Sequence, residues 1–127
     1  YIDRKSDGDF KSTLSGGLSR FRRELQRVKD FDSYLFIVVE SDLNRLYKNN
    51  KYGPHKSNLK FIYHNMRLIA HEFADNCQFV FTGTRANSQS IIPKILTLGK
   101  KLWNVDLQYY IDKNNIGKPD QKMNLEV

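Results

Sequence analysis

Apolar residues recur along this chain in two kinds of pattern, short unbroken runs and stripes at helical spacing. Two of the runs, at residues 34–40 (YLFIVVE) and 77–81 (CQFVF), are aromatic and β-branched and show no alternation with polar residues. Such runs are typical of strands that are buried on both faces of a sheet. Residues 1–3 resemble the end of a further strand. The pattern therefore predicts at least three short strands.

Three other stretches carry apolar residues at helical spacing. The stripes consist of Leu14, Leu18, Phe21, Leu25 and Val28, then Leu59, Ile62, Met66, Ile69 and Phe73, then Ile92, Ile95, Leu98 and Leu102. We expect the first helix to become regular only after Gly16 and Gly17, because each glycine costs about 1 kcal/mol relative to alanine. We expect Ser88 or Ser90 to cap the third helix, with Pro93 in its first turn.

The remaining segments are predicted to be mostly irregular. Residues 6–10 (SDGDF) are rich in turn formers, and residues 44–58 are polar and basic and predict a long loop. Residues 107–111 suit either a last strand or a short amphipathic helix. Residues 112–127 are polar and predict a C-terminal tail.

Strands that alternate with helices predict an α/β fold, a single three-layer domain with a central, mostly parallel sheet flanked by helices. A length of 127 residues suits one such domain. The longest apolar run, residues 35–39, is too short for a membrane span, and neither end shows a signal-peptide pattern. One cysteine, Cys77, is typical of a reducing compartment. We therefore expect an intracellular protein, cytoplasmic or nuclear, with no membrane partner.

Charge narrows the class of partner. The chain has 21 Lys and Arg against 14 Asp and Glu, a formal net charge of +7, which favours a polyanion such as nucleic acid. The basic residues concentrate on the polar face of the first helix and in the predicted loop. The candidate DNA contacts are Arg20, Arg22, Arg23, Arg27, Lys48 and Lys51. A solvated helix face and a solvated loop are the alternative interpretations.

Candidate chemistry begins at the end of the first predicted strand. Alternate residues of a strand point to the same side, so Asp3 and Lys5 face one pocket while Arg4 points away. A carboxylate there can hold Mg²⁺ or Mn²⁺, and an ammonium group can offset charge on a reacting phosphate. Asp9 follows closely, and Glu40 ends a buried strand, where α/β sheets bind ligands. An exposed strand end and turn is the structural alternative.

The order of these segments resembles the XPF/Hef nuclease family. Residues 3–9 (DRKSDGD) match the family motif ERKxxxD with Asp in place of Glu. A glycine-started helix, a strand ending in VVE, the strand QFVFTG and the helix SIIPKIL follow in the family's order, so the resemblance covers residues 1–111. It implies a restriction-endonuclease-like core, with further strands and the family's Gly-Asp pair upstream of Tyr1.

The resemblance also implies an activity, namely metal-dependent cleavage of branched or junction DNA in repair, recombination or replication. It assigns Asp3, Asp9 and Glu40 to a Mg²⁺ or Mn²⁺ ion, Lys5 to the water or the transition-state charge, and Arg4 to a phosphate. It further implies a homodimer or heterodimer through the helical side of the domain.

The family has a Gly-Arg pair near the start of its helix, where this chain has Gly16-Gly17-Leu18. The family's arginine is therefore absent here, unless Arg20 takes its place. This departure and the Asp at position 3 favour the alternative function, a catalytically inactive nuclease-like module that binds DNA or acts as a scaffold. The retained Lys5, Asp9 and Glu40 favour an enzyme, because a decayed site usually loses its lysine or an acid. A related resolvase or restriction-type nuclease would share this chemistry. His64 and His71 are not joined by a Cys or a third His in a zinc-binding pattern, so zinc is not predicted. The sequence contains no Walker-type loop, so a nucleotide cofactor is not predicted.

Overall fold

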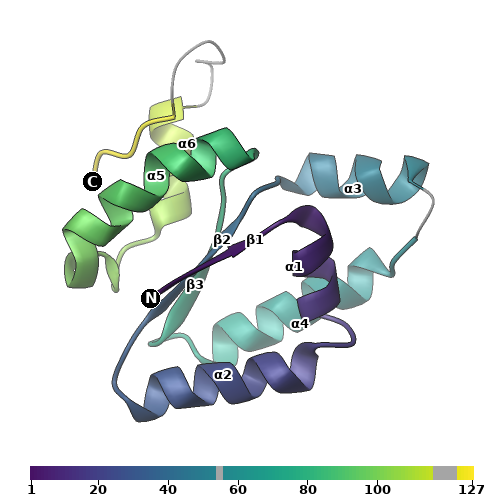
Figure 1. Cartoon of the computed structure of the whole chain (residues 1–127), viewed down its shortest axis with the longest axis horizontal. Coiled ribbons are helices and arrows are strands. Elements are labelled where there is room, and N and C mark those ends of the chain that lie inside the picture. The colour runs from purple at the N-terminus through teal and green to yellow at the C-terminus, as the bar shows by residue number, and fades with distance from the viewer. Residues whose placement is uncertain (54–55, 116–122) are drawn as a thin grey trace.

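Three parallel strands form the centre of the protein in a computed structural model, which describes residues 1–53, 56–115 and 123–127. Their order in the sheet is that of the chain: β1 (Ile2–Lys5), β2 (Leu35–Val39) and β3 (Cys77–Phe81) (Figure 1). Asp3 lies opposite Ile37, and Ile37 lies opposite Phe79. All five residues of β2 are buried, as expected for a central strand covered on both faces.

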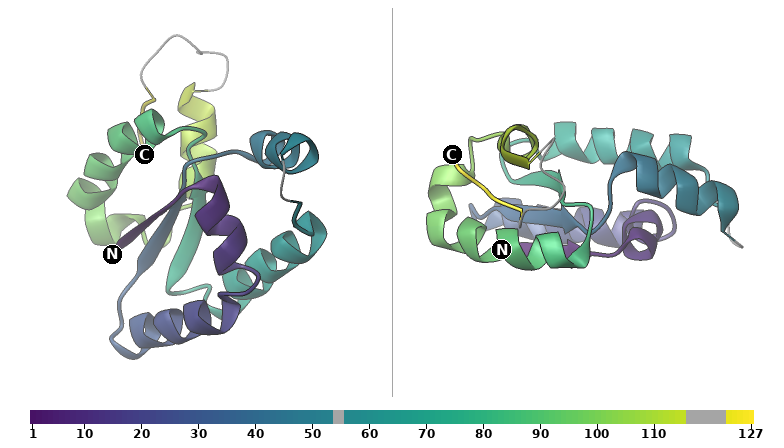
Figure 2. Two further views of the ribbon diagram at one scale, coloured as in Figure 1. Left: turned by 45° about the vertical axis from the view of Figure 1, so that its right-hand side comes forward. Right: turned by 90° about the horizontal axis from the view of Figure 1, so that it is seen from above.

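Helices follow each strand and cover both faces of the sheet. They are α1 (Asp7–Thr13) and α2 (Leu18–Asp30) after β1, α3 (Leu43–Tyr52) and α4 (Leu59–Glu72) after β2, and α5 (Arg85–Leu98), the 3₁₀ helix η1 (Gly99–Leu102) and α6 (Leu107–Asn115) after β3. Figures 1 and 2 show α5 and α6 on one side of the strands and α1, α2 and α4 on the other. The predicted class, a single three-layer α/β domain with a parallel sheet, is confirmed.

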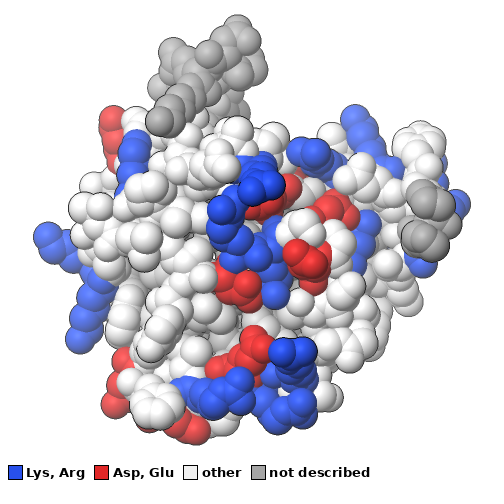
Figure 3. Space-filling model, viewed as in Figure 1, with Lys and Arg blue, Asp and Glu red and all other residues white. Residues whose placement is uncertain are grey.

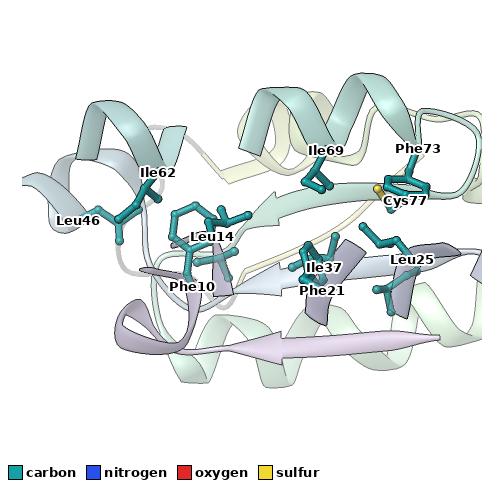
Figure 4. Close-up of a cluster of buried hydrophobic side chains, with 12 residues drawn as sticks. Phe10, Leu14, Phe21, Leu25, Ile37, Leu46, Ile62, Ile69, Phe73 and Cys77 are labelled. Carbon is teal, nitrogen blue, oxygen red and sulfur yellow. The ribbon is translucent and has the colours of Figure 1, made fainter. Parts of the chain in front are cut away.

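Two clusters of buried hydrophobic side chains separate these layers. The first core, drawn in Figure 4, consists of Phe10, Leu14, Phe21, Leu25, Leu35, Ile37, Val39, Leu46, Ile62, Ile69, Phe73 and Cys77. The second core consists of Tyr34, Phe36, Val38, Val80, Ile91, Ile95, Leu102, Leu107, Ile111 and Leu125. Successive residues of β2 alternate between them, with Ile37 in the first core and Val38 in the second. This alternation tells which face a side chain of β1 or β2 occupies.

The three predicted strands and the helix over residues 59–72 are confirmed. The expectation that the first helix becomes regular after its glycines is also confirmed, because α2 begins at Leu18. The predicted turn at residues 6–10 is wrong, since a separate helix, α1, begins at Asp7. Ser6 caps it by accepting a hydrogen bond from the Asp9 backbone, and the Asp9 side chain accepts one from the Ser6 backbone.

The long loop predicted over residues 44–58 is also wrong. Helix α3 occupies most of it, capped by Asp42, whose carboxylate accepts a hydrogen bond from the Arg45 backbone at 2.8 Å. One apolar residue, Leu46, anchors α3 in the first core and is fully buried. A single anchoring side chain gives no periodicity, which explains why the sequence pattern did not indicate this helix. Residues 54–55 lie outside the described residues.

The third predicted helix exists but begins earlier than expected. Thr84 caps α5, so that Ser88 and Ser90 lie within the helix rather than at its cap, and Pro93 lies in its interior rather than in its first turn. Ser88 is instead buried and forms a hydrogen bond with Thr82 at 2.6 Å. The prediction of a helix here was therefore right, and the predicted start of the helix was wrong.

The described residues near the end of the chain do not form the polar tail that the sequence predicts. The ambiguous segment at residues 107–111 is helical, and α6 continues through the predicted boundary at residue 111 to Asn115. Leu125 is 5% exposed and packs in the second core. Residues 116–122, which belong to the predicted tail, lie outside the described residues. Among the described residues, every helix is too short or too polar to cross a membrane.

Candidate functional site

Asp3 and Lys5 extend from the face of β1 that carries the first core. Their partners in β2 are Ile37 and Val39, which belong to that core. The Lys5 Nζ atom lies 3.0 Å from Oδ2 of Asp3 and 5.5 Å from the centre of the Phe21 ring. The Lys5 side chain is only 12% exposed. The structure therefore brings the acid and the base of the Asp-x-Lys motif together, as strand alternation predicts.

Lys5 borders an open pocket of about 570 Å³ between β1, the end of α1 and the start of α2. Its lining is formed by Lys5, Ser12, Thr13, Ser15, Gly16, Gly17, Arg20, Phe21 and Glu24. We call this the Lys5 pocket. It combines two cationic side chains with three hydroxyl groups, which are the groups that bind an oxyanion. Within the described part of the chain, Glu24 is the one acidic residue that lines it.

The glycine pair shapes this pocket. The Gly17 backbone N–H donates to the Ser12 carbonyl at 2.9 Å, and a Cβ atom at position 17 would lie 3.1 Å from that same oxygen. Gly17 therefore lets the start of α2 approach the end of α1 closely. Among the side chains that the structure describes, none caps the first turn of α2 at Gly17, so this helix start adds positive potential at the pocket.

The arginines of α2 differ in their surroundings. Arg20 is 82% exposed, and its Nε atom lies 3.6 Å from Glu24. Arg22 pairs with Glu72 of α4. Arg23 and Arg27 are exposed on the same helix. Figure 3 shows basic side chains over α2 and near the end of β1, with acidic side chains among them. Of the predicted α2 contacts, only Arg20 lines the Lys5 pocket.

Arg4 and Glu40 lie on the opposite face of the sheet. Arg4 is opposite Val38, a second-core residue, and its Nη2 and Nε atoms lie 2.6 Å and 2.9 Å from Oε1 of Glu40. The prediction that Glu40 faces the same site as Asp3 is therefore wrong. The predicted roles of Arg4 and Glu40 beside Lys5 are not supported by this geometry, because the sheet itself separates them.

The three carboxylates predicted to share a metal ion are thus not brought together. Asp3 pairs with Lys5, Glu40 pairs with Arg4, and Asp9 takes part in the capping box of α1. Within the described ranges, no group of three or more His, Cys, Asp or Glu side chains is arranged to hold a metal ion. The set Asp3, Asp9 and Glu40 does not fit a shared Mg²⁺ or Mn²⁺ ion.

Asp7 is half-buried and connects α1 with the end of β2 and with α3, and no sequence motif singled it out. Its Oδ2 atom accepts hydrogen bonds from the Ser41 hydroxyl at 3.2 Å and the Asn49 amide at 3.1 Å, and its Oδ1 atom lies 2.8 Å from Lys11. Ser41 is fully buried at the end of β2. Burial, and secondarily the charge of Asp7, raise the pKa of Tyr63. The Ser-x-x-Asp spacing of the capping box was the available signal for this helix start.

Lys48 and Lys51 lie on α3, away from the lining of the Lys5 pocket. The Lys51 ammonium group lies 5.8 Å from the ring centre of Tyr47 and 5.4 Å from that of Tyr52. The two predicted contacts, Lys48 and Lys51, therefore lie on a second surface, separate from the one that contains Asp3.

The chain matches no protein-family model, no curated protein and no solved structure. The resemblance to the XPF/Hef family therefore depends on the motif at residues 3–9 and on the order of the elements.

Proposed function

We propose that this chain binds the sugar–phosphate backbone of DNA and places one phosphate in the Lys5 pocket. The observation that carries the proposal is the position of Lys5 and Arg20 around one pocket at the uncapped start of α2. A helix start without a side-chain cap favours anions, and two nearby cations strengthen that preference.

The surroundings of the pocket support a polymeric anion rather than a small one. Arg23 and Arg27 continue along α2 as exposed cations, and the chain as a whole carries a formal net charge of +7. A pocket that is open to solvent also lets a phosphate remain part of a continuous backbone. Phosphate contacts of this kind position DNA without reading its sequence.

Cleavage of branched DNA is the second candidate function. It is favoured by the 3.0 Å contact between Asp3 and Lys5, because the resemblance assigns an ion-binding carboxylate and a charge-stabilising lysine to these positions. Of the three carboxylates that the resemblance assigns to the ion, only Asp3 lies beside Lys5. Binding is therefore the function that the geometry supports best.

The test is the affinity for labelled duplex, forked and four-way DNA, measured by fluorescence anisotropy between 50 and 200 mM salt. Lys5→Met and Arg20→Met are compared with Lys101→Met, which removes an exposed cation from η1 on the opposite side of the sheet. We expect Lys5→Met to weaken binding about tenfold and to reduce the salt slope by about one. Equal affinities for Lys5→Met and Lys101→Met would contradict the proposal.

The same proteins are then incubated with these DNAs in Mg²⁺, in Mn²⁺ and in EDTA. Metal-dependent products that are lost in Lys5→Met would establish the second candidate. Intact DNA that is bound through Lys5 would leave binding alone as the function.

A further inference from the structure

Helix α3 carries aromatic side chains that the core does not use. Tyr47 is 54% exposed and Tyr52 is 76% exposed, although both are large. The Lys51 ammonium group lies within 6 Å of both ring centres, so the two rings and one cation form a single surface cluster. Exposed aromatic groups gathered with a cation in this way are typical of a binding surface.

A groove of about 490 Å³ runs beside this cluster, between α3 and the start of α4. We call it the α3 groove, and its largest side chains are Leu43, Tyr47, Lys51, Leu59, Lys60 and Tyr63. No acidic residue of the described chain lines it. The groove therefore offers aromatic and aliphatic walls with two lysines, a combination that fits an occupant with flat apolar faces and negative charges.

We propose that the α3 groove binds an unpaired strand of a polynucleotide, with one base stacked on Tyr47 and the adjoining phosphates paired with Lys51 and Lys60. The identity of the occupant as DNA rests on the proposed function. Base stacking on aromatic side chains combined with basic residues that follow the backbone is how proteins hold single strands. The bases of a duplex are already stacked on each other, so the groove selects unpaired nucleotides.

A second copy of this chain fits the groove less well. Two copies joined through this surface would bring Lys48, Lys51 and Lys60 of each copy close to those of the other. Like charges that face each other across an interface oppose association. The charge of the surface is complementary to a polyanion instead.

The groove and the Lys5 pocket lie on the same face of the sheet. Leu46 of α3 and Phe21 of α2 both pack in the first core, and the Asn49 amide of α3 donates to Asp7 of α1 at 3.1 Å. The last two residues of α1, Ser12 and Thr13, line the pocket. The substrate class that engages both surfaces is DNA with a duplex part and an unpaired part.

The test uses a single-stranded oligonucleotide that contains 2-aminopurine, whose fluorescence is quenched by stacking, and a duplex of the same sequence. Tyr47→Ala and Tyr47→Phe are compared with Tyr109→Ala, which removes a tyrosine of similar exposure from α6 on the other side of the sheet. We expect Tyr47→Ala to weaken single-strand binding about tenfold and to remove the quenching, as for the loss of one base–aromatic stack. Tyr47→Phe keeps the ring and retains both, and Tyr109→Ala changes neither.

Single-strand binding by Tyr47→Ala that equals that by Tyr109→Ala would overturn the inference. A dimer in sedimentation velocity that Tyr47→Ala dissociates would also overturn it and would assign the groove to a second copy. The two proposals fail separately. If Lys5→Met leaves the affinity for duplex DNA unchanged, the phosphate pocket is refuted. If Tyr47→Ala leaves the affinity for single-stranded DNA unchanged, the stacking site is refuted.

Discussion

The Nζ atom of Lys5 lies 3.0 Å from Oδ2 of Asp3, and the Lys5 side chain, which lines the Lys5 pocket, is 12% exposed. A carboxylate in this position neutralises part of the charge that the lysine offers to a phosphate. As long as no cation is bound to the Asp3 carboxylate, it competes for the Lys5 ammonium group with any anion that enters the pocket. The first prediction follows from this competition.

We predict that Asp3→Asn tightens DNA binding in EDTA. The substitution removes the competing negative charge and leaves the shape of the side chain nearly unchanged, so that Lys5 interacts more strongly with a phosphate. Because the pair is partly exposed, we expect a gain of about two- to fivefold, measured by anisotropy. Asp75→Asn, an exposed change at the other end of the sheet, serves as the control. Weaker binding by Asp3→Asn than by this control would show that the carboxylate does not compete with DNA.

A second prediction separates the structural role of Asp9 from the catalytic role that the resemblance implies. Ser6 and Asp9 satisfy backbone groups at the start of α1. We expect Ser6→Ala to lower the free energy of unfolding by about 1 kcal/mol, and Asp9→Ala to lower it by a similar or smaller amount. Urea unfolding of both single variants and the double variant measures this.

Because the two side chains act in one capping box, the double variant should lose less stability than the sum of the single variants. DNA affinity of Asp9→Ala should stay within twofold of the original. Additive losses, or a large loss of affinity in Asp9→Ala alone, would argue against the capping role.

The third prediction compares two adjacent glycines. A Cβ atom at Gly17 would lie 3.1 Å from the Ser12 carbonyl oxygen and 3.3 Å from the Thr13 Cα atom, both of which belong to the backbone. A Cβ atom at Gly16 would meet nothing within 4 Å. We therefore expect Gly17→Ala to destabilise the protein by about 1 kcal/mol, and Gly16→Ala to be neutral or stabilising by up to about 1 kcal/mol. Thermal unfolding of the two variants in parallel decides this, and equal midpoints would contradict it.

The sequence predicted the sheet because β2 and β3 are continuous apolar runs. Strands buried on both faces leave a signal in composition alone, which depends on no distant contact. Helix α4 was predicted for a similar reason, since its stripe repeats over four turns. Helices α1 and α3 were missed because each carries a single buried core residue, Phe10 in α1 and Leu46 in α3. Their stability depends on capping and on tertiary packing that the local pattern does not contain.

The candidate site was predicted only where a single strand determines it. Asp3 and Lys5 lie on one strand, so their common face follows from alternation. Whether Glu40 joins them depends on the register between β1 and β2, which places Arg4 opposite Val38. A shift of one residue would move every side chain of a strand to the other face, and no residue of the chain indicates that register in advance. Alternation within β1 therefore did not locate Glu40, and the structure does not bring Asp3, Asp9 and Glu40 together.

The last prediction concerns the buried thiol at the start of β3. Burial raises the pKa of Cys77 to about 12 from its ordinary 9.0. Between these two values the unfolded chain loses the proton while the folded protein keeps it. The contribution of this thiol to the free energy of unfolding should therefore be constant below about pH 9 and should fall as the pH rises toward 12.

Cys77→Ala removes this titration. Its smaller side chain lowers stability by an amount that does not depend on pH, and Tyr34 and Tyr63, whose pKa values are also raised by burial, titrate in both proteins. We expect the loss of stability between pH 8 and pH 10.5 to be about 1–2 kcal/mol larger in the original protein than in Cys77→Ala, measured by urea unfolding. Identical losses in the two proteins would show that the thiol is not held protonated by burial.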